Sequence, residues 1–164
     1  MTYSDDLTVL MTADNAPVPN VTSASSVEST WDSFKAFDHN ETADNKWLAN
    51  AATGWIKFDF GSALYAMSKY TILIPDEAAE VTRAPSNWTL DGSNNDSDWT
   101  TLDTQTSQSF TNHERKTYTF TNSTKYRYYR INVTANNGGA LMGMQEIQMM
   151  RQIVSEANNY YLDV

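Results

Sequence analysis

Apolar and polar side chains alternate in short runs along most of the chain, which is the pattern of β-strands with one buried and one solvent-facing side. The alternation is clearest in three runs, whose inward-facing positions are Ile56, Phe58 and Phe60; Tyr70, Ile72 and Ile74; and Tyr129, Ile131 and Val133. Gly, Asn and Pro follow these runs, as expected where strands turn. We therefore predict strands at residues 55–61, 70–74 and 126–134.

Weaker runs extend this pattern over most of the remaining chain. They predict a first strand within residues 1–12, on the alternation of Leu7, Val9 and Met11, and further strands or extended pieces at residues 21–27, 88–93, 99–103, 117–120 and 144–150. The Asn/Asp/Ser-rich stretch 94–98 indicates a hairpin between two of them, and residues 75–85 read as a loop. About eight short strands without a helical period predict an all-β fold, an antiparallel β-sandwich.

The chain divides into a sandwich domain at residues 1–150 and a tail at residues 151–164. The domain is long enough to bury a sizeable core. The tail is polar and ends in Asn158-Asn159-Tyr160-Tyr161-Leu162-Asp163-Val164. This composition is typical of a linker or of an arm that lies on a partner in an assembly.

Charge and composition narrow the classes of partner. The net charge of -9 argues against nucleic acid and anionic membranes and favours cations. No apolar run approaches the roughly 20 residues of a membrane span, so we expect no membrane insertion. The acidic start, Met1 to Asp6, lacks the basic and apolar parts of a signal peptide. The chain has no cysteine, so it needs no disulfide.

No catalytic constellation is visible, and we predict that the domain is not an enzyme. His39 and His113 are the two histidines, and neither belongs to a recognisable motif. The chain also lacks a zinc-protease motif, a phosphate-binding loop and a nucleophile elbow. Its many carboxylates do not lie in apolar surroundings that would raise a pKa for acid catalysis.

One polar stretch carries candidate chemistry. It runs from Ala36 to Trp47, and most of its side chains bear oxygen: Asp38, Asn40, Glu41, Thr42, Asp44 and Asn45. Ca²⁺ takes six to eight such hard oxygen ligands. Asp and Asn also favour ordinary solvated turns, because they bond to the nearby backbone. Both interpretations remain open from these residues alone.

An ordered set of motifs resembles the discoidin, or coagulation factor 5/8 type C, domain. The set consists of Ser25-Ser26; Ala36-Phe37-Asp38 with Trp47; residues 54–62; residues 83–94 with Trp99; residues 126–131; and residues 145–149. It spans about Met11 to Met150. The stretches 88–103 and 126–139 are most similar to carbohydrate-binding module family 32-like domains of phage tail and bacterial proteins. The resemblance implies an eight-stranded jelly-roll sandwich that binds glycans without catalysis.

The resemblance also implies a structural Ca²⁺. Its ligands would be the Lys35 carbonyl, side-chain oxygen from Asp38, and contributions from Asn40, Asn45 and Glu146. The chain departs from the family pattern at two positions. His39 stands where the family often has Gly, and Asn45 stands where it often has Thr. Asn still offers an oxygen, but its reach differs.

The sugar-binding candidates lie in loops expected at one end of the sandwich: Trp31, His39, Arg83, Asn87 and Asn137. Each also has a structural interpretation. Trp31 could cap the core and His39 could occupy a turn; Arg83 could pair with Glu80 or Asp76; Asn87 could cap a strand, and Asn137 could adopt positive φ. The other tryptophans, Trp47, Trp55, Trp88 and Trp99, are assigned mainly to core and rim packing.

The resulting hypothesis is a carbohydrate-binding or adhesion module on a phage virion or at an extracellular surface. It would recognise a cell-surface glycan of galactose type or a cell-wall polysaccharide. The alternative is a virion structural or decoration protein that uses the sandwich and the tail to bind other virion proteins. A lipid-binding discoidin domain is a weaker third hypothesis, because only Trp31 and Leu141-Met142 offer apolar loop tips.

Overall fold

The computed structural model describes residues 1–42 and 45–153, which form eleven strands and two short helices. In chain order the elements are β1 (Thr2–Tyr3), β2 (Val21–Ala24), the 3-10 helix η1 (Ser33–Ala36), β3 (Trp47–Ala49), β4 (Gly54–Asp59), β5 (Met67–Leu73), α1 (Ala78–Arg83), β6 (Pro85–Ser93), β7 (Thr100–Gln105), β8 (Arg115–Thr119), β9 (Tyr128–Asn136), β10 (Met142–Met144) and β11 (Glu146–Ile153).

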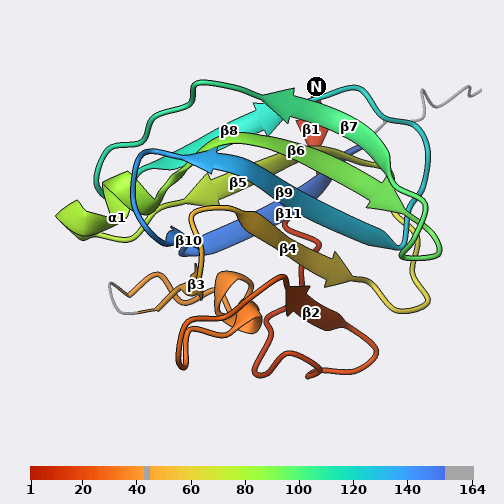
Figure 1. Ribbon diagram of the computed structural model, residues 1–164. Coiled ribbons are helices and arrows are strands. Elements are labelled where there is room, and N and C mark those ends of the chain that lie inside the picture. Colours follow the sequence, from red (N-terminus) through yellow and green to blue (C-terminus); the bar gives the residue numbers. More distant parts are fainter. Residues whose placement is uncertain (43–44, 154–164) are drawn as a thin grey trace, which may run out of the picture.

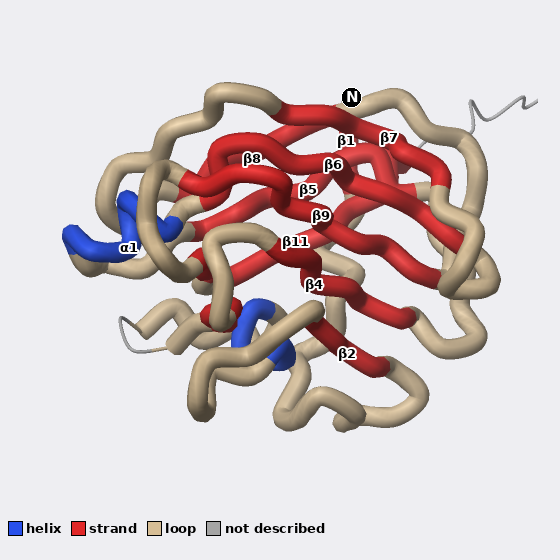
Figure 2. The backbone as a smooth tube through the Cα atoms, in the orientation of Figure 1, coloured by secondary structure: helices blue, strands red, loops and turns tan. Residues whose placement is uncertain are grey.

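Two antiparallel sheets form the body of the molecule (Figures 1 and 2). One sheet has the strand order β1-β11-β5-β8, and the other has the order β2-β4-β9-β6-β7. A separate antiparallel pair is formed by β10 and β3, which lie more than 90 residues apart in the sequence. The helices η1 and α1 lie at the periphery of the sheets in Figure 2. The predicted antiparallel β-sandwich is confirmed in outline.

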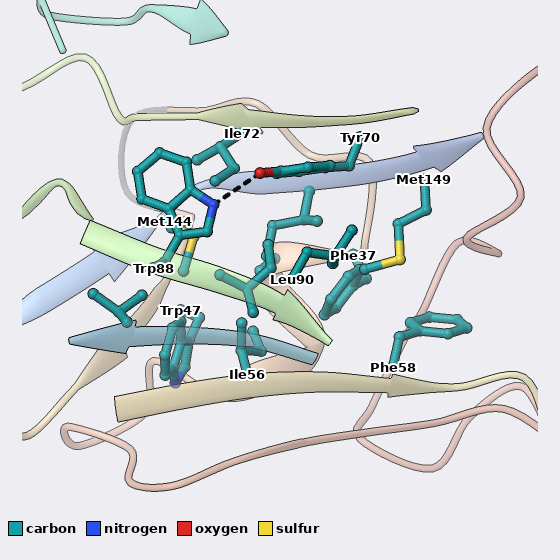
Figure 3. Packing of buried hydrophobic residues seen from close by; sticks show 14 of the residues in the cluster. Phe37, Trp47, Ile56, Phe58, Tyr70, Ile72, Trp88, Leu90, Met144 and Met149 are labelled. Carbon is teal, nitrogen blue, oxygen red and sulfur yellow. Dashed lines mark hydrogen bonds between the residues drawn. The ribbon is translucent and has the colours of Figure 1, made fainter. Parts of the chain in front are cut away.

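The core lies between the sheets and contains the inward positions that alternation predicted. Ile56, Ile72 and Ile131 are buried, as are the inward-facing aromatic residues of the same runs, Phe58, Phe60, Tyr70 and Tyr129. Trp88 and Tyr70 come from opposite sheets and meet in the core, where the indole Nε1–H donates to the Tyr70 hydroxyl oxygen at 2.9 Å (Figure 3). Period-two patterning therefore placed the buried face correctly, because each strand has only one face toward the core.

The first strand predicted within residues 1–12 exists, but not at Leu7, Val9 and Met11, on whose alternation the prediction rested. The side chains of Val9 and Leu10 are both exposed, whereas Thr8 is buried, which breaks the alternation. The Asp6 carboxylate accepts hydrogen bonds from the Thr8 N–H at 3.0 Å and its hydroxyl at 2.7 Å. Such side-chain bonds to the local backbone favour a turn over a strand ladder. The first strand is instead Thr2–Tyr3, which pairs with β11.

The loop expected at residues 75–85 contains the helix α1. The helix has less than two turns, and its buried side chain is the acidic residue Glu80. No apolar period marks it, because its inward position is polar. Ion pairs replace apolar packing here: the Glu80 carboxylate lies 3.1 Å from the Lys46 Nζ and 2.6 Å from the Arg83 Nη1.

The last strand is longer than expected. Residues 151–153 continue β11, and Gln152 and Ile153 pair with β1. The remaining residues of the predicted tail, 154–164, lie outside the described part of the chain. Among the described residues, no helix has the length and apolar character needed to cross a membrane.

Candidate functional site

Backbone and side-chain oxygens converge in the loop that follows η1. The Asn45 Nδ2 lies 3.2 Å from the Lys35 carbonyl oxygen, 3.0 Å from the Asn40 carbonyl oxygen, and 2.8 and 3.1 Å from the two Asp38 carboxylate oxygens. We call these four oxygens the oxygen cradle. The structure therefore brings together the four ligand candidates that lie in this loop, with the Asn45 amide nitrogen among the oxygens of the other three.

Glu146, the fifth ligand candidate, begins β11 beside this loop. Its side chain is fully buried, and neither carboxylate oxygen has a hydrogen-bond partner among the described residues. Burial raises the pKa of Glu146 to about 9, and the negative charges of Asp38 and Asp6 add to the rise. Glu146, Asp6 and His39 also place ligand atoms within 4.8 Å of one another.

A divalent cation fits part of this arrangement. Two carboxylates and two carbonyls are hard oxygen donors, and the unpartnered Glu146 carboxylate is a group that a cation would neutralise. However, the centre of the oxygen cradle holds a hydrogen-bond donor, the Asn45 amide. Ca²⁺ could enter only if that amide moved away. Calcium binding by Lys35, Asp38, Asn40, Asn45 and Glu146 therefore stays a prediction, with Asn45 as its competitor.

His39 keeps the turn geometry that the family provides with glycine. Its φ angle is +56°, in the left-handed region that favours Gly but that Asn, Asp and His tolerate better than other residues. The imidazole points toward the N-terminal segment, with its Nε2 3.3 Å from an Asp6 carboxylate oxygen and 3.2 Å from the Thr8 carbonyl oxygen. The positive φ and these contacts agree with the interpretation of His39 as a turn residue.

Two of the proposed sugar-binding side chains contact charged neighbours. The Trp31 ring is half-buried, and the ammonium groups of Lys35 and Lys46 lie 5.0 and 4.7 Å from its centroid. The Arg83 guanidinium pairs with the Glu80 carboxylate at 2.6 Å, as one of the sequence interpretations predicted. Both side chains thus contribute to the protein's own charge network.

The two proposed asparagines also bond to the protein itself. The Asn87 side-chain oxygen accepts a hydrogen bond from the Ser107 N–H at 2.7 Å, and the Asn137 amide donates to the Ala84 carbonyl at 3.0 Å. The expectation that Asn137 adopts positive φ is wrong. The adjacent Gly138 adopts it instead, at +99°, because glycine does so without a Cβ clash.

A hollow that sequence reasoning did not assign lies on the outer face of the sheet β2-β4-β9-β6-β7. It has a volume of about 270 Å³ and is lined by Trp55, Lys57, Asp96, Trp99 and Arg130. We call it the outer-face pocket. Trp55 and Lys57 come from β4 and Arg130 comes from β9, the strands that lie side by side in Figure 1. Its two half-buried indoles stand beside three charged groups.

Strand register builds the outer-face pocket. Lys57 on β4 pairs with Arg130 on β9, so both side chains leave the same face of the sheet. The β6–β7 hairpin then adds Trp99, whose ring centroid is 4.1 Å from the Arg130 Cζ, and Asp96, whose carboxylate is 2.6 Å from the Lys57 Nζ. Alternation alone already predicted that Trp55 and Lys57 point outward, but not which residues would join them.

Comparison with known proteins places the chain in a recognised group. The F5/8 type C domain model matches residues 20–147, and no curated protein matches the chain. CpGH89CBM32-5 from Clostridium perfringens, in complex with GalNAc-beta-1,3-galactose, has a TM-score of 0.66 and 15% identity, with 79% of this chain and 94% of that chain covered. The family 32 carbohydrate-binding module of C. perfringens NanJ, in complex with galactose, has a TM-score of 0.67 and 18% identity, with 80% and 93% covered. The family 32 module of AlyQ, in complex with 4,5-unsaturated mannuronic acid, has a TM-score of 0.65 and 17% identity, with 91% and 98% covered. These likenesses confirm the predicted all-β sandwich.

Proposed function

The chain belongs to the F5/8 type C domain family, and from that premise we propose that it is a non-catalytic carbohydrate-binding module. Solved structures with the same fold include modules in complex with galactose and with an unsaturated mannuronic acid. These complexes support a glycan as the ligand class. The proposal places the module at an extracellular or virion surface, where cell-surface glycans are accessible.

The outer-face pocket is the observation that carries this proposal. A sugar ring needs a flat apolar surface for its C–H face and polar groups at its edge for its hydroxyls. Trp55 and Trp99 supply indole surface. Lys57, Arg130 and Asp96 lie at the rim, where Lys57 pairs with Asp96 and Arg130 pairs with Asp91. A sugar would bond to the remaining donors and acceptors of these ion pairs. A volume of about 270 Å³ is just below the range of roughly 300–1,000 Å³ for small-ligand sites. It suits one sugar ring, with the rest of a chain extending over the sheet.

Substitution of the pocket tryptophans tests the proposal. Trp55→Ala and Trp99→Ala should each weaken binding on a glycan array carrying galactose-type and uronic acid sugars at least about tenfold, which is the effect of losing about 1.4 kcal/mol of contact. Trp31→Ala is the matched control, because it removes the loop-end indole and leaves the pocket intact. Circular dichroism spectra of all variants should match the parent.

Two outcomes would contradict this assignment. Loss of binding in Trp31→Ala with full binding in Trp55→Ala would move the sugar to the loop end of the sandwich. A parent protein that stays folded but binds no sugar on the array would remove the carbohydrate-binding function altogether.

Truncation separates sugar binding from the alternative role in virion assembly. Because β11 includes Ile153, a chain that ends at residue 153 keeps every described strand. We expect it to bind the same glycans as the full chain with unchanged affinity. If residues 154–164 are an assembly arm, the truncated chain will instead lose self-association or particle attachment, measured by light scattering and by co-sedimentation with particles.

A further inference from the structure

We propose that the Asn45 side-chain amide takes the place of a metal cation in the oxygen cradle, so that the loop closes without Ca²⁺. The amide nitrogen lies within 3.2 Å of four oxygens from Lys35, Asp38 and Asn40. Four oxygens around one point form the kind of coordination shell that a cation fills. Here an N–H donor of the chain itself fills it, and this inference does not depend on the proposed sugar-binding function.

The chemistry of the neighbours fixes the orientation of the amide. The oxygen and nitrogen of an Asn side chain are alike in size and position, so the hydrogen-bond network decides which atom lies where. In the oxygen cradle every close neighbour of the Asn45 Nδ2 is an acceptor. Turning the amide over would bring its oxygen against four other oxygens. The nitrogen therefore belongs at the centre, and Asn45 cannot act as an oxygen ligand in this rotamer.

Distances separate an amide-filled cradle from a metal-filled one. Oxygen ligands lie 2.3–2.6 Å from Ca²⁺, whereas the cradle oxygens lie 2.8–3.2 Å from the Asn45 nitrogen. The longer values are those of ordinary N–H···O hydrogen bonds. The cradle is therefore shaped around the amide group, and Asn45 itself is 8% exposed, which ties the side chain to this position.

The Asn45 side chain connects two segments of the chain, the end of the loop that leads into β3 and the residues in and after η1. Asn45 is followed by Lys46 and Trp47, which are buried, and Trp47 pairs with Met144 on β10. The amide bonds back to Lys35 at the end of η1 and to Asp38 and Asn40 beyond it. One side chain thus connects the start of the loop to the strand that closes it, which is the connection that a bound cation would make.

Calcium titration of the parent protein and of Asn45→Asp tests the inference. After treatment with EDTA, millimolar Ca²⁺ should leave the melting temperature of the parent unchanged, and calorimetry should detect no binding. Asn45→Asp puts a carboxylate oxygen where the donor was. In EDTA it should melt well below the parent, and Ca²⁺ should restore at least about 5 °C, the rise expected when ligand exceeds its Kd about a hundredfold.

Two controls keep the outcome unambiguous. Asn50→Asp adds the same charge at an exposed position of the neighbouring turn and should respond to neither EDTA nor Ca²⁺. Calorimetry on the parent does not depend on whether Asn45→Asp folds. A Ca²⁺-induced rise of about 5 °C in the parent, or measurable Ca²⁺ binding to it, would overturn the inference and restore the metal clamp predicted from the sequence.

Discussion

Replacing Glu80 with alanine should destabilise the domain by about 3–5 kcal/mol, the cost of breaking a buried ion pair from one side. The Glu80 side chain is fully buried, and its carboxylate forms ion pairs with two cations, the Lys46 ammonium at 3.1 Å and the Arg83 guanidinium at 2.6 Å. Lys46 is itself only 3% exposed. Without Glu80 its positive charge remains buried beside the Trp31 ring, and its remaining counter-charge is the more distant and partly exposed Glu77 carboxylate, 3.7 Å away.

Alanine removes the carboxylate that Lys46 and Arg83 share but does not weaken the helix, so the loss of stability can be assigned to the ion pairs. Alanine has the highest helix propensity, so α1 keeps its local stability. The measurement is urea denaturation followed by circular dichroism, together with a Tm expected to fall by roughly 10 °C.

Glu77→Ala provides the matched control for this experiment. Glu77 also faces Lys46, but at 3.7 Å and with a side chain that is 40% exposed. Exposed pairs contribute about 0–1 kcal/mol, so Glu77→Ala should change the stability by less than about 1 kcal/mol. Equal losses of stability in Glu80→Ala and Glu77→Ala would contradict the prediction, because they would show that burial of the Glu80 ion pairs adds nothing to their effect.

The strands could be predicted from the sequence where burial follows a strict period of two. β9 illustrates this, because Tyr129, Ile131 and Val133 are buried and the residues between them are not. Prediction failed where tertiary partners decide the structure. β1 exists because the end of the same chain pairs with it, and α1 is anchored by a buried acid rather than by an apolar stripe. Neither partner is visible in the local pattern.

The candidate sites show the same division. The metal-ligand candidates of the loop could be grouped from the sequence, because they lie within eleven residues of one another and match an ordered family motif. The role of the Asn45 amide could not be predicted from the sequence, since the orientation of the amide depends on which atoms surround it in the folded chain. The outer-face pocket needed knowledge of register: Lys57 and Arg130 are far apart in the sequence and become neighbours only through the pairing of β4 and β9.

Replacing Trp88 with alanine should lower the free energy of unfolding by about 3–5 kcal/mol, as much as Glu80→Ala, because it removes a very large side chain from a packed core. Trp88 is 1% exposed and packs edge-on against Tyr118 at a centroid distance of 5.2 Å. Neighbouring side chains can collapse only partly into such a space. Urea denaturation should therefore show a lower midpoint than for any of the outer-face variants.

Smaller substitutions separate packing from hydrogen bonding in this part of the core. Tyr70 accepts a hydrogen bond from the Trp88 indole at 2.9 Å and donates one to the Asp103 carboxylate at 2.8 Å. This relay joins β6, β5 and β7, and so ties one sheet to the other; Figure 3 shows its Trp88–Tyr70 bond. Tyr70→Phe leaves the indole N–H buried without an acceptor, which should cost about 1–3 kcal/mol.

A double-mutant cycle of Trp88→Phe and Tyr70→Phe measures the bond itself. The doubly substituted core contains neither the donor nor the acceptor, so it should lose about 1 kcal/mol less than the sum of the two single losses. Tyr118→Phe is the control for removing a core hydroxyl, since the Tyr118 hydroxyl has only a long contact, 3.4 Å, to Gln108. Strict additivity in the cycle would show that the Trp88–Tyr70 hydrogen bond contributes nothing, and that packing alone holds the two sheets together at this point.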